Sequence, residues 1–337
     1  MSKLGKKNLF VDINDDNFLV CVGEYDDELN FSILEKEKLS PSGFYKGKIV
    51  NLDTAVNNLK KIINKIEKKT NFLFSDVNLI LNQTEIDCIN VNGFKKLNGN
   101  QILPEDISYI LNDIKTKIVE SEKKKSIVHL FNSIYLLDNK LIKNLPIGLH
   151  GDFYSHQLTF FMINNNDFKN IKILFNRCNL NLNKVVLKSF IDGIKILNKF
   201  KKKTFINIKI DKNETQLIFF YDSAFLFFQK FNFGSDIIIK DISKVCSLDI
   251  SNVKNIISET NFEFTDKNIY LDKKYFDKNN FRKISLSHIK EISSARIEEM
   301  TNILFNRNRN LTYLKDNDIS VYLDFEDKKT IFKLKNI

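Results

Sequence analysis

The sequence has little of what marks membrane-spanning or disulfide-bonded proteins. No apolar run approaches the roughly 18 residues that cross a bilayer. The basic stretch 1–8 leads into a short strand pattern, which argues against a signal peptide. The 337 residues include four cysteines, each alone in an apolar segment: Cys21, Cys88, Cys178 and Cys246. Because no CxxC pair is present, we predict a reduced, cytoplasmic protein.

Metal-binding and nucleophilic motifs are also missing. The four histidines, His129, His150, His156 and His288, lack the spacing of metal ligands, and we interpret them as structural. No nucleophile elbow or Cys/His motif is present. We therefore predict no metal site and no catalytic residue.

The net charge of +10 raises the question of a nucleic-acid partner. Arginine is scarce, the lysines are spread along the chain, and no aromatic–basic platform or finger motif accompanies them. We expect no nucleic-acid binding. Attraction to an anionic membrane surface agrees better with the same charge.

Two segments, 8–22 and 204–221, have the pattern of a β-hairpin: an apolar run, a polar tetrapeptide and a second apolar run. Paired hairpins of this kind open the two halves of actin-like nucleotide-binding proteins. There, glycine-rich turns let backbone N–H groups close on phosphate. Neither turn here contains glycine, and Asp15 and Asp16 in the first turn would repel phosphate. A phosphate site at these turns is therefore in doubt.

The rest of the chain divides into two lobes and an inserted module. A strand over 29–34, a helix over 55–69 and a buried strand over 76–81 follow the first hairpin, with Asp53 or Thr54 as the helix cap. This βββαβ order predicts an α/β protein with a two-lobed, actin-like (ribonuclease H-like) fold. The predicted domains are a first lobe of 1–83 and 163–200, an inserted subdomain of 84–162, and a second lobe of 201–337 with its helical part at about 236–306.

Four segments carry a family resemblance: 43–52, 145–151, 234–242 and 294–300. The first reads Gly-x-x-x-Gly-x-Ile-x-Asn-Leu, and the second contains Pro-x-Gly-Leu-x-Gly. In this order the chain resembles the bacterial cell-division protein FtsA, the actin homologue that links FtsZ filaments to the membrane. The resemblance extends over about residues 8–325, and it implies the FtsA-type inserted subdomain.

The resemblance implies ATP and Mg²⁺ as cofactors, but the matching positions have changed. The family's phosphate-loop positions fall on five residues here: Asp12, Asn14, Asn17, Asp211 and Thr215. Loop glycines are replaced by residues with side chains, which disfavours positive φ and blocks close backbone approach. We therefore expect nucleotide binding to be weak or lost, and a non-catalytic adaptor.

The resemblance also implies partners. Arg282 and Arg296 lie where the family receives the acidic C-terminal peptide of FtsZ, and arginine suits carboxylates. The inserted subdomain, 84–162, corresponds to a self-association surface. Other division proteins are expected as partners. Membrane contact at the division septum, on the cytoplasmic side of the inner membrane, is expected to be weak or indirect.

Some alternatives stay open. Asp12 is either a Mg²⁺-directed carboxylate or a residue at a strand end, and the second is favoured. The two arginines equally fit a solvated helix face. The segment 328–337 reads as a basic anchor or, preferably, as a strand, and the chain is expected to be shortened at its C-terminus. Alternative functions are an active actin-like ATP-binding protein and a type IV pilus-assembly scaffold.

Overall fold

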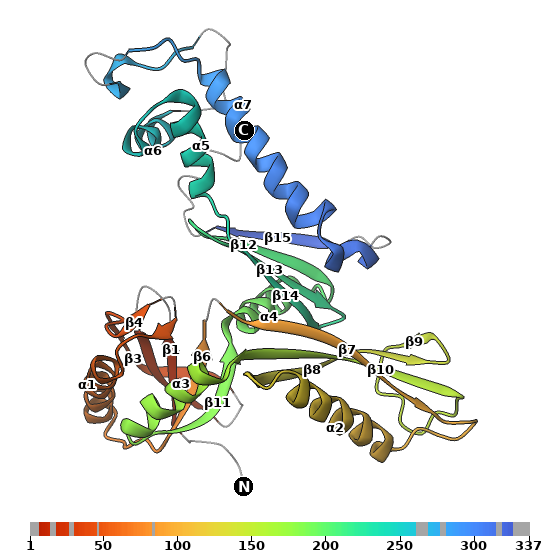
Figure 1. Ribbon diagram of the computed structural model, residues 1–337. Coiled ribbons are helices and arrows are strands. Elements are labelled where there is room, and N and C mark those ends of the chain that lie inside the picture. The colour runs from red at the N-terminus through yellow and green to blue at the C-terminus, as the bar shows by residue number, and fades with distance from the viewer. Residues whose placement is uncertain are drawn as a thin grey trace. The chain divides into compact units, whose positions relative to one another are not determined.

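The computed structural model describes residues 7–13, 18–26, 30–45, 47–82, 85–260, 269–276, 281–314 and 319–325 (Figure 1). The chain forms two compact units. The first contains residues 1–203 and 220–228, and the second contains 204–219 and 229–337. Within the described ranges, no helix combines the length and apolar character that a bilayer crossing requires.

The first unit contains a five-stranded sheet in the order β11-β6-β1-β2-β3. Its strands are β1 (Asn8–Ile13), β2 (Phe18–Tyr25), β3 (Phe31–Leu39), β6 (Asp76–Leu81) and β11 (Asn181–Leu187). The hairpin β1–β2–β3 is antiparallel, whereas β6 is parallel to both β1 and β11. Ile13, Leu81 and Leu187 are aligned in register, so the three parallel strands end at one edge of the sheet. The predicted first hairpin is confirmed.

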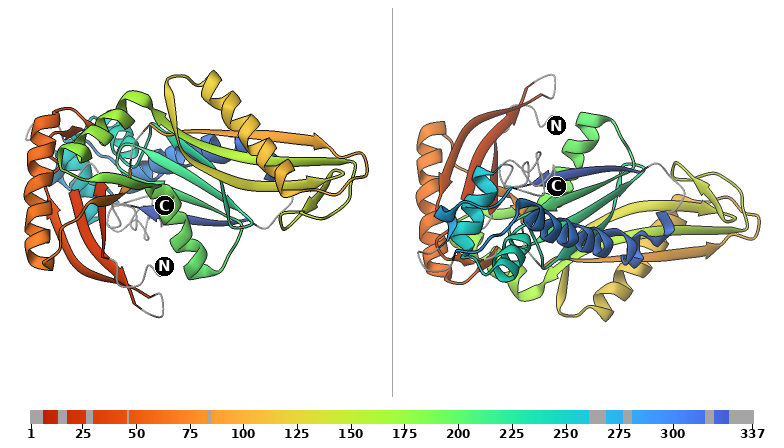
Figure 2. Two further views of the ribbon diagram at one scale, coloured as in Figure 1. Left: turned by 90° about the horizontal axis from the view of Figure 1, so that it is seen from below. Right: turned by 90° about the horizontal axis from the view of Figure 1, so that it is seen from above.

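Three helices, α1 (Leu52–Thr70), α3 (Asn165–Arg177) and α4 (Lys188–Phe200), and two short strands, β4 (Phe44–Tyr45) and β5 (Lys48–Ile49), accompany this sheet. Helix α1 lies along one face of the sheet (Figure 2), and its apolar stripe is buried as predicted. The predicted cap is wrong. Asn51 caps α1, because its side-chain oxygen accepts the N–H of Thr54 at 3.0 Å.

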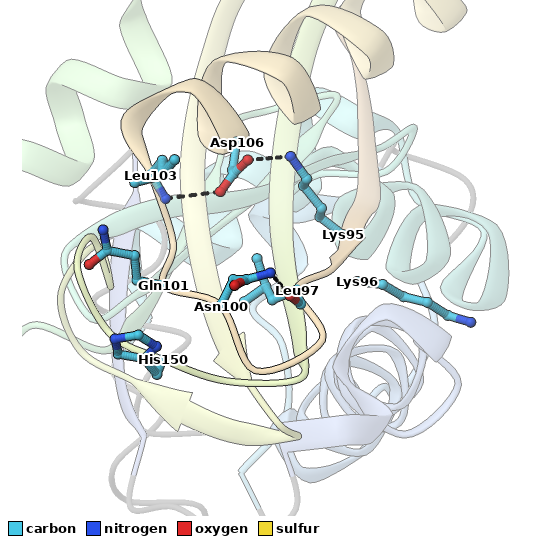
Figure 3. Close-up of a pocket in the computed structure, with 8 residues that line it drawn as sticks. All are labelled: Lys95, Lys96, Leu97, Asn100, Gln101, Leu103, Asp106 and His150. Atoms are coloured by element: carbon cyan, nitrogen blue, oxygen red, sulfur yellow. Dashed lines mark hydrogen bonds and ion pairs between the residues drawn. The ribbon is translucent and has the colours of Figure 1, made fainter.

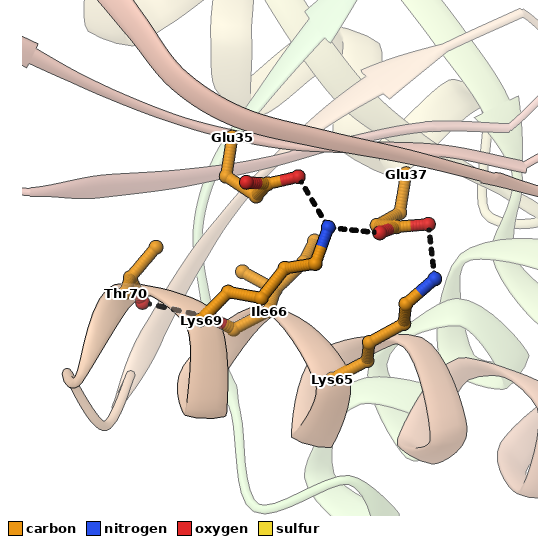
Figure 4. A network of polar contacts seen from close by, with 6 residues as sticks. All are labelled: Glu35, Glu37, Lys65, Ile66, Lys69 and Thr70. Carbon is orange, nitrogen blue, oxygen red and sulfur yellow. Dashed lines mark hydrogen bonds and ion pairs between the residues drawn. The ribbon is translucent and has the colours of Figure 1, made fainter.

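The edge strand β3 is longer than the predicted 29–34, and ion pairs fix its extension (Figure 4). Lys69 of α1 lies 2.8 Å from both Glu35 and Glu37, and Lys65 lies 2.9 Å from Glu37. Lys69 and then Lys65, as hydrogen-bond donors, hold the pKa of Glu37 below its usual range. Charged side chains on an edge strand also discourage pairing with a second chain.

The inserted module is a second, antiparallel sheet in the order β7-β10-β8-β9. Its strands are β7 (Asp87–Lys96), β8 (Lys125–Leu137), β9 (Lys140–Ile142) and β10 (Phe153–Asn164). Helix α2 (Pro104–Ser121) begins with a proline that suits a first helical turn. It packs its isoleucines against the sheet. At Gly93 the contact is so close that a Cβ would overlap Ile110 and Ile114.

A cluster of phenylalanines joins this module to α4 and to the hairpin tip that belongs to the first unit. Phe161 stacks on Phe225 with ring centroids 4.3 Å apart, and Phe131 lies 4.9 Å from Phe190 of α4. Gly193 leaves room for Phe220 against the same helix. The ring contacts therefore fix the position of α4 against the inserted module.

The second unit repeats the plan of the first sheet. Its sheet has the order β14-β13-β12-β15, with β12 (Phe205–Ile210), β13 (Thr215–Tyr221), β14 (Ala224–Phe231) and β15 (Ser320–Phe325). As β6 does with β1, β15 pairs in parallel with β12. The segment 328–337, for which a strand was preferred, lies outside the described residues.

The remaining elements of the second unit are mostly helical. They are α5 (Asp236–Cys246), α6 (Ile250–Glu259), α7 (Leu286–Thr301), a π-helical turn over Asn302–Asn306, and 3₁₀ turns over Lys273–Tyr275 and Arg309–Leu314. Their apolar faces form one core, which includes Ile242, Ile256 and Ile289. Helices α5, α6 and α7 and the π-helical turn lie within the stretch of about 236–306 that the sequence predicts to be helical.

His156 is an unusual member of the core beneath α2. It is fully buried in β10, opposite Gly93 and Tyr135. Within the described part of the chain, neither of its ring nitrogens has a hydrogen-bond partner. Burial therefore favours the neutral ring and lowers the pKa of His156 to about 4.

This burial predicts an acid-sensitive module. An unfolded histidine takes a proton near pH 6.5, whereas the folded ring stays neutral down to about pH 4. The free energy of unfolding should fall by up to about 3 kcal/mol as the pH drops between these values. His156→Leu should abolish most of this slope, as measured by urea denaturation across the range. His150→Leu, at an exposed position, should keep it, and an unchanged slope in His156→Leu would contradict the assignment.

Candidate functional site

The first candidate site lies at the shared edge of the parallel strands in the first unit. Asp12, near the end of β1, is buried, with only 7% of its side chain exposed. Its Oδ2 accepts a hydrogen bond from Lys188 Nζ at 2.8 Å. The other oxygen, Oδ1, is buried and has no hydrogen-bond partner in the described ranges. The carboxylate is therefore paired within the chain.

Lys188 is the first residue of α4, and several contacts hold it in place. The N–H of the preceding Leu187 donates to Nε2 of His129 at 3.2 Å. Burial lowers the pKa of His129, which keeps the ring neutral and able to accept this bond. The phenylalanine cluster fixes the rest of the helix. Asn14 and Asn17, which the resemblance placed at phosphate-loop positions of the first turn, lie outside the described residues.

The second candidate site is the turn between β12 and β13. The N–H of Asp211 bonds the carbonyl of Glu214 at 2.9 Å, which closes the turn. Thr215 is fully buried, and its hydroxyl donates to the carbonyl of Phe233 at 2.7 Å. Each carboxylate of the turn is paired with a lysine, Glu214 with Lys230 and Asp211 with Lys209.

Main-chain groups of this turn are joined to the start of α5. The N–H of Ser235 bonds the carbonyl of Asp211 at 3.0 Å, and that of Asp236 bonds the carbonyl of Lys212 at 2.9 Å. The N-terminal N–H groups of a helix are the donors that hold anions in many proteins. Here two amides at the start of the helix are used by the turn itself.

The two arginines proposed as partner contacts lie in the second unit but differ in environment. Arg282 is exposed just before α7. Arg296 lies within α7, where it forms ion pairs with Asp241 of α5 and with Glu299. The hydrogen bond that Arg296 Nε donates to the carboxylate of Asp241 is the main cause that raises the pKa of Arg296. Arg296 therefore joins α5 to α7.

An open pocket of about 670 Å³ lies in the inserted module (Figure 3). It is lined by Lys95, Lys96, Leu97, Asn100, Gln101, Leu103, Asp106 and His150. Its acidic residue, Asp106, is already used: it pairs with Lys95 and accepts the N–H of Leu103 at 2.9 Å. Asn100 donates to the carbonyl of Leu97 at 2.9 Å, and Nδ1 of His150 lies 3.0 Å from the carbonyl oxygen of Gly99. Among the residues that the structure describes, no three metal-ligating side chains lie together.

Sequence reasoning singled out Asp12 but missed Lys188. The signal was available, because Lys188 directly follows the strand pattern Val185-Val186-Leu187. If that strand is parallel to the first, the two carboxyl ends share an edge of the sheet. The pairing was not expected because 176 positions separate the two residues.

Comparison with known proteins identifies relatives. No family model matches the chain. The chain is 25% identical over 315 residues to the cell-division protein FtsA of Buchnera aphidicola from Schizaphis graminum, covering 91% of this chain and 74% of that protein. For FtsA of Buchnera from Acyrthosiphon pisum, the identity is 24% and the coverages are 76% and 61%. FtsA of Escherichia coli K12 is 24% identical, and the match covers 48% of this chain and 38% of that protein. The chain thus spans less than two thirds of the length of the latter two relatives.

A solved structure shares the fold. A chain of the PilM–PilN type IV pilus biogenesis complex aligns with a TM-score of 0.56 at 9% identity, covering 98% of this chain and 83% of that one. The predicted fold class is confirmed: an α/β protein of the actin-like class. Within that class, the chain is similar in sequence to FtsA over most of its length.

The junction of the second turn with α5 yields a prediction. A Cβ at Gly234 would overlap the main-chain oxygen of Asp211, and that backbone cannot move without breaking the bonds to α5. Gly234→Ala should lower the free energy of unfolding by about 1–3 kcal/mol, as expected for overpacking. Lys212→Ala, which trims an exposed side chain of the same turn, should change it by less than about 0.5 kcal/mol. Equal urea midpoints for the two variants would refute this account.

Proposed function

We propose that this protein is an FtsA-like adaptor that acts in cell division by binding FtsZ and helping to assemble or tether the division ring at the cytoplasmic membrane. The observation that carries the proposal is the similarity to FtsA over 91% of the chain. The adaptor is proposed to act at the septum, on the cytoplasmic side of the inner membrane, with other division proteins as further partners.

The acidic peptide of FtsZ is proposed to bind the second unit at a basic–aromatic surface, which we define as Tyr270, Lys273, Phe281, Arg282 and Lys283. Two lysines lie over aromatic rings here: Lys283 over Tyr270 at 4.3 Å and Lys273 over Phe281 at 5.4 Å. Both rings are exposed, Tyr270 by 40% and Phe281 by 48%. Cations beside exposed rings offer a peptide with carboxylates and apolar side chains contacts of both kinds.

Within this proposal the two arginines have different roles. Arg282 is exposed and belongs to the basic–aromatic surface, so we propose it as the first contact for a carboxylate. Arg296 would have to exchange Asp241 or Glu299 for the peptide. Its proposed contribution is therefore smaller and depends on the packing of α5 against α7.

The protein is proposed to bind Mg-ATP weakly or not at all. Both turns lack glycine, and Asp12 pairs with an ammonium group instead of facing an open space. The carbonyls of the second turn accept the first N–H groups of α5. These residues do not fit a magnesium-phosphate group, which requires free donors and an accessible carboxylate.

Self-association is proposed to use the outer part of the inserted module. Six large apolar side chains are exposed there: Phe94, Leu103, Leu141, Leu145, Ile147 and Leu149. Grouped exposure of this kind is typical of protein interaction surfaces. Membrane contact is proposed to be weak or indirect. The net charge of +10 supports attraction to anionic lipid, without a defined anchor among the described residues.

A scaffold role in type IV pilus assembly is the second candidate function. It is favoured by the shared fold with a chain of the pilus complex, whereas sequence similarity favours FtsA.

Reversing one charge tests the peptide site. Arg282→Glu should weaken binding of a labelled FtsZ C-terminal peptide at least about tenfold, because an attractive contact becomes a repulsive one. Fluorescence anisotropy with the full chain measures this. Lys254→Glu on the exposed side of α6 makes the same change in net charge and should bind nearly as wild type. A peptide affinity unchanged in Arg282→Glu would exclude this surface.

Calorimetry tests the nucleotide proposal. Titration of the protein with Mg-ATP should give no binding with a dissociation constant in the micromolar range, because both turns lack the glycines that close on phosphate. Micromolar binding, with or without hydrolysis, would support the alternative of an active actin-like ATP-binding protein.

A further inference from the structure

The ion pair between Asp12 and Lys188 is unlike the other ion pairs of the first sheet. Most of those join side chains at the surface, such as Lys69 with Glu35, in which 43% and 28% of the side chains are exposed. In the Asp12–Lys188 pair, the carboxylate is 7% exposed and the ammonium 30%. The carboxylate is thus the buried partner, and the lysine reaches it from the edge of the sheet.

The position of Asp12 in a central strand buries its negative charge within the sheet. β1 lies between β2 and β6, and Asp12 pairs in register with Leu19 on one side and Ile80 on the other. The negative charge of Asp12 acts on a neighbouring group. Burial of the Cys21 thiol in β2 is the main cause that raises the pKa of Cys21, and the charge of Asp12 is the second cause. A carboxylate here is costly unless a cation compensates it.

Lys188 supplies that cation from two strands away. β11 ends at Leu187, β6 separates it from β1, and the side chain of Lys188 crosses the end of β6 to reach Asp12. The backbone of Leu187 is held by His129. The ammonium group is therefore positioned by the fold before any ligand arrives.

We propose that Lys188 is a built-in counter-ion, which neutralises Asp12 in the place where a divalent cation would otherwise be needed. The pair joins the ends of β1 and β11 and keeps the edge of the first sheet in one arrangement without metal or nucleotide. It follows that divalent cations do not control the stability of the protein. This inference deepens the proposed loss of Mg-ATP binding, but it does not depend on the FtsZ peptide site.

A double-mutant cycle in buffer without divalent cations tests the pairing. Lys188→Met leaves a buried carboxylate alone and should raise the unfolding equilibrium constant about ten- to a hundredfold. Asp12→Asn leaves a lysine that can turn to solvent, so it should cost less. The double variant should lose less stability than the sum of the two single variants. Lys184→Met, which removes an exposed lysine of the same strand, is the matched control and should behave as wild type.

A second measurement asks whether the lysine replaces a metal. Millimolar magnesium or manganese chloride should raise the melting temperature of Lys188→Met but not that of wild type or of the double variant, which lacks the carboxylate. Additive losses in the cycle, or a wild type stabilised by magnesium as much as Lys188→Met, would overturn the proposal.

Two further outcomes keep the test decisive. If Lys188→Met does not fold, the double variant with Asp12→Asn should still fold, and Lys188→Arg should restore most of the stability. Failure of both would show that position 188 matters for packing and not for charge. Because no arm uses the FtsZ peptide, a negative result here leaves the proposed partner site standing, and loss of that site leaves this proposal intact.

Discussion

A buried carboxylate at the end of a central strand constrains the first unit. Parallel strands β1, β6 and β11 end at one edge, so whatever compensates Asp12 must come from that edge. In this chain it comes from the residue that begins α4. The phenylalanine cluster and the bond to His129 then serve an electrostatic purpose as well as packing, because they place Lys188 within reach.

The first and second sheets share a strand arrangement but differ in how polar groups near the hairpin turn are paired. Each has an antiparallel hairpin with a parallel strand beside its first strand. In the second sheet, the carbonyls of the hairpin turn accept hydrogen bonds from the first amides of α5, and the carboxylates of the turn are paired with lysines. Both sites thus pair their charged groups within the chain, by the ion pair of Asp12 in one case and by ion pairs and backbone hydrogen bonds in the other.

Much of the fold could be predicted from local patterns, since hairpins, amphipathic helices and buried strands each have their own periodicity. The predicted ends of helices and strands were wrong where a polar side chain determines the end. Asn51 caps α1 although Asp53 and Thr54 follow it, and β3 extends to Leu39 because lysines of α1 neutralise its glutamates. Both effects depend on three-dimensional neighbours that a local pattern does not contain. The same holds for the candidate site: Asp12 was found by its motif position, whereas the partners of Arg296 required the structure, and Lys188 could be placed only with the parallel alignment of β11 and β1 in mind.

Internal pairing of Asp12 and of the second turn changes what the fold can be selected for. A nucleotide site gains affinity from donors and carboxylates left unpaired in the free protein, and such groups reduce stability until the ligand binds. With Asp12 and the second turn paired within the chain, that cost is absent, which supports the proposed loss of nucleotide affinity. The basic–aromatic surface proposed as the partner site lies outside these turns, where cations lie beside exposed rings. The proposed partner binding would need a rigid framework, to which the internal pairs contribute.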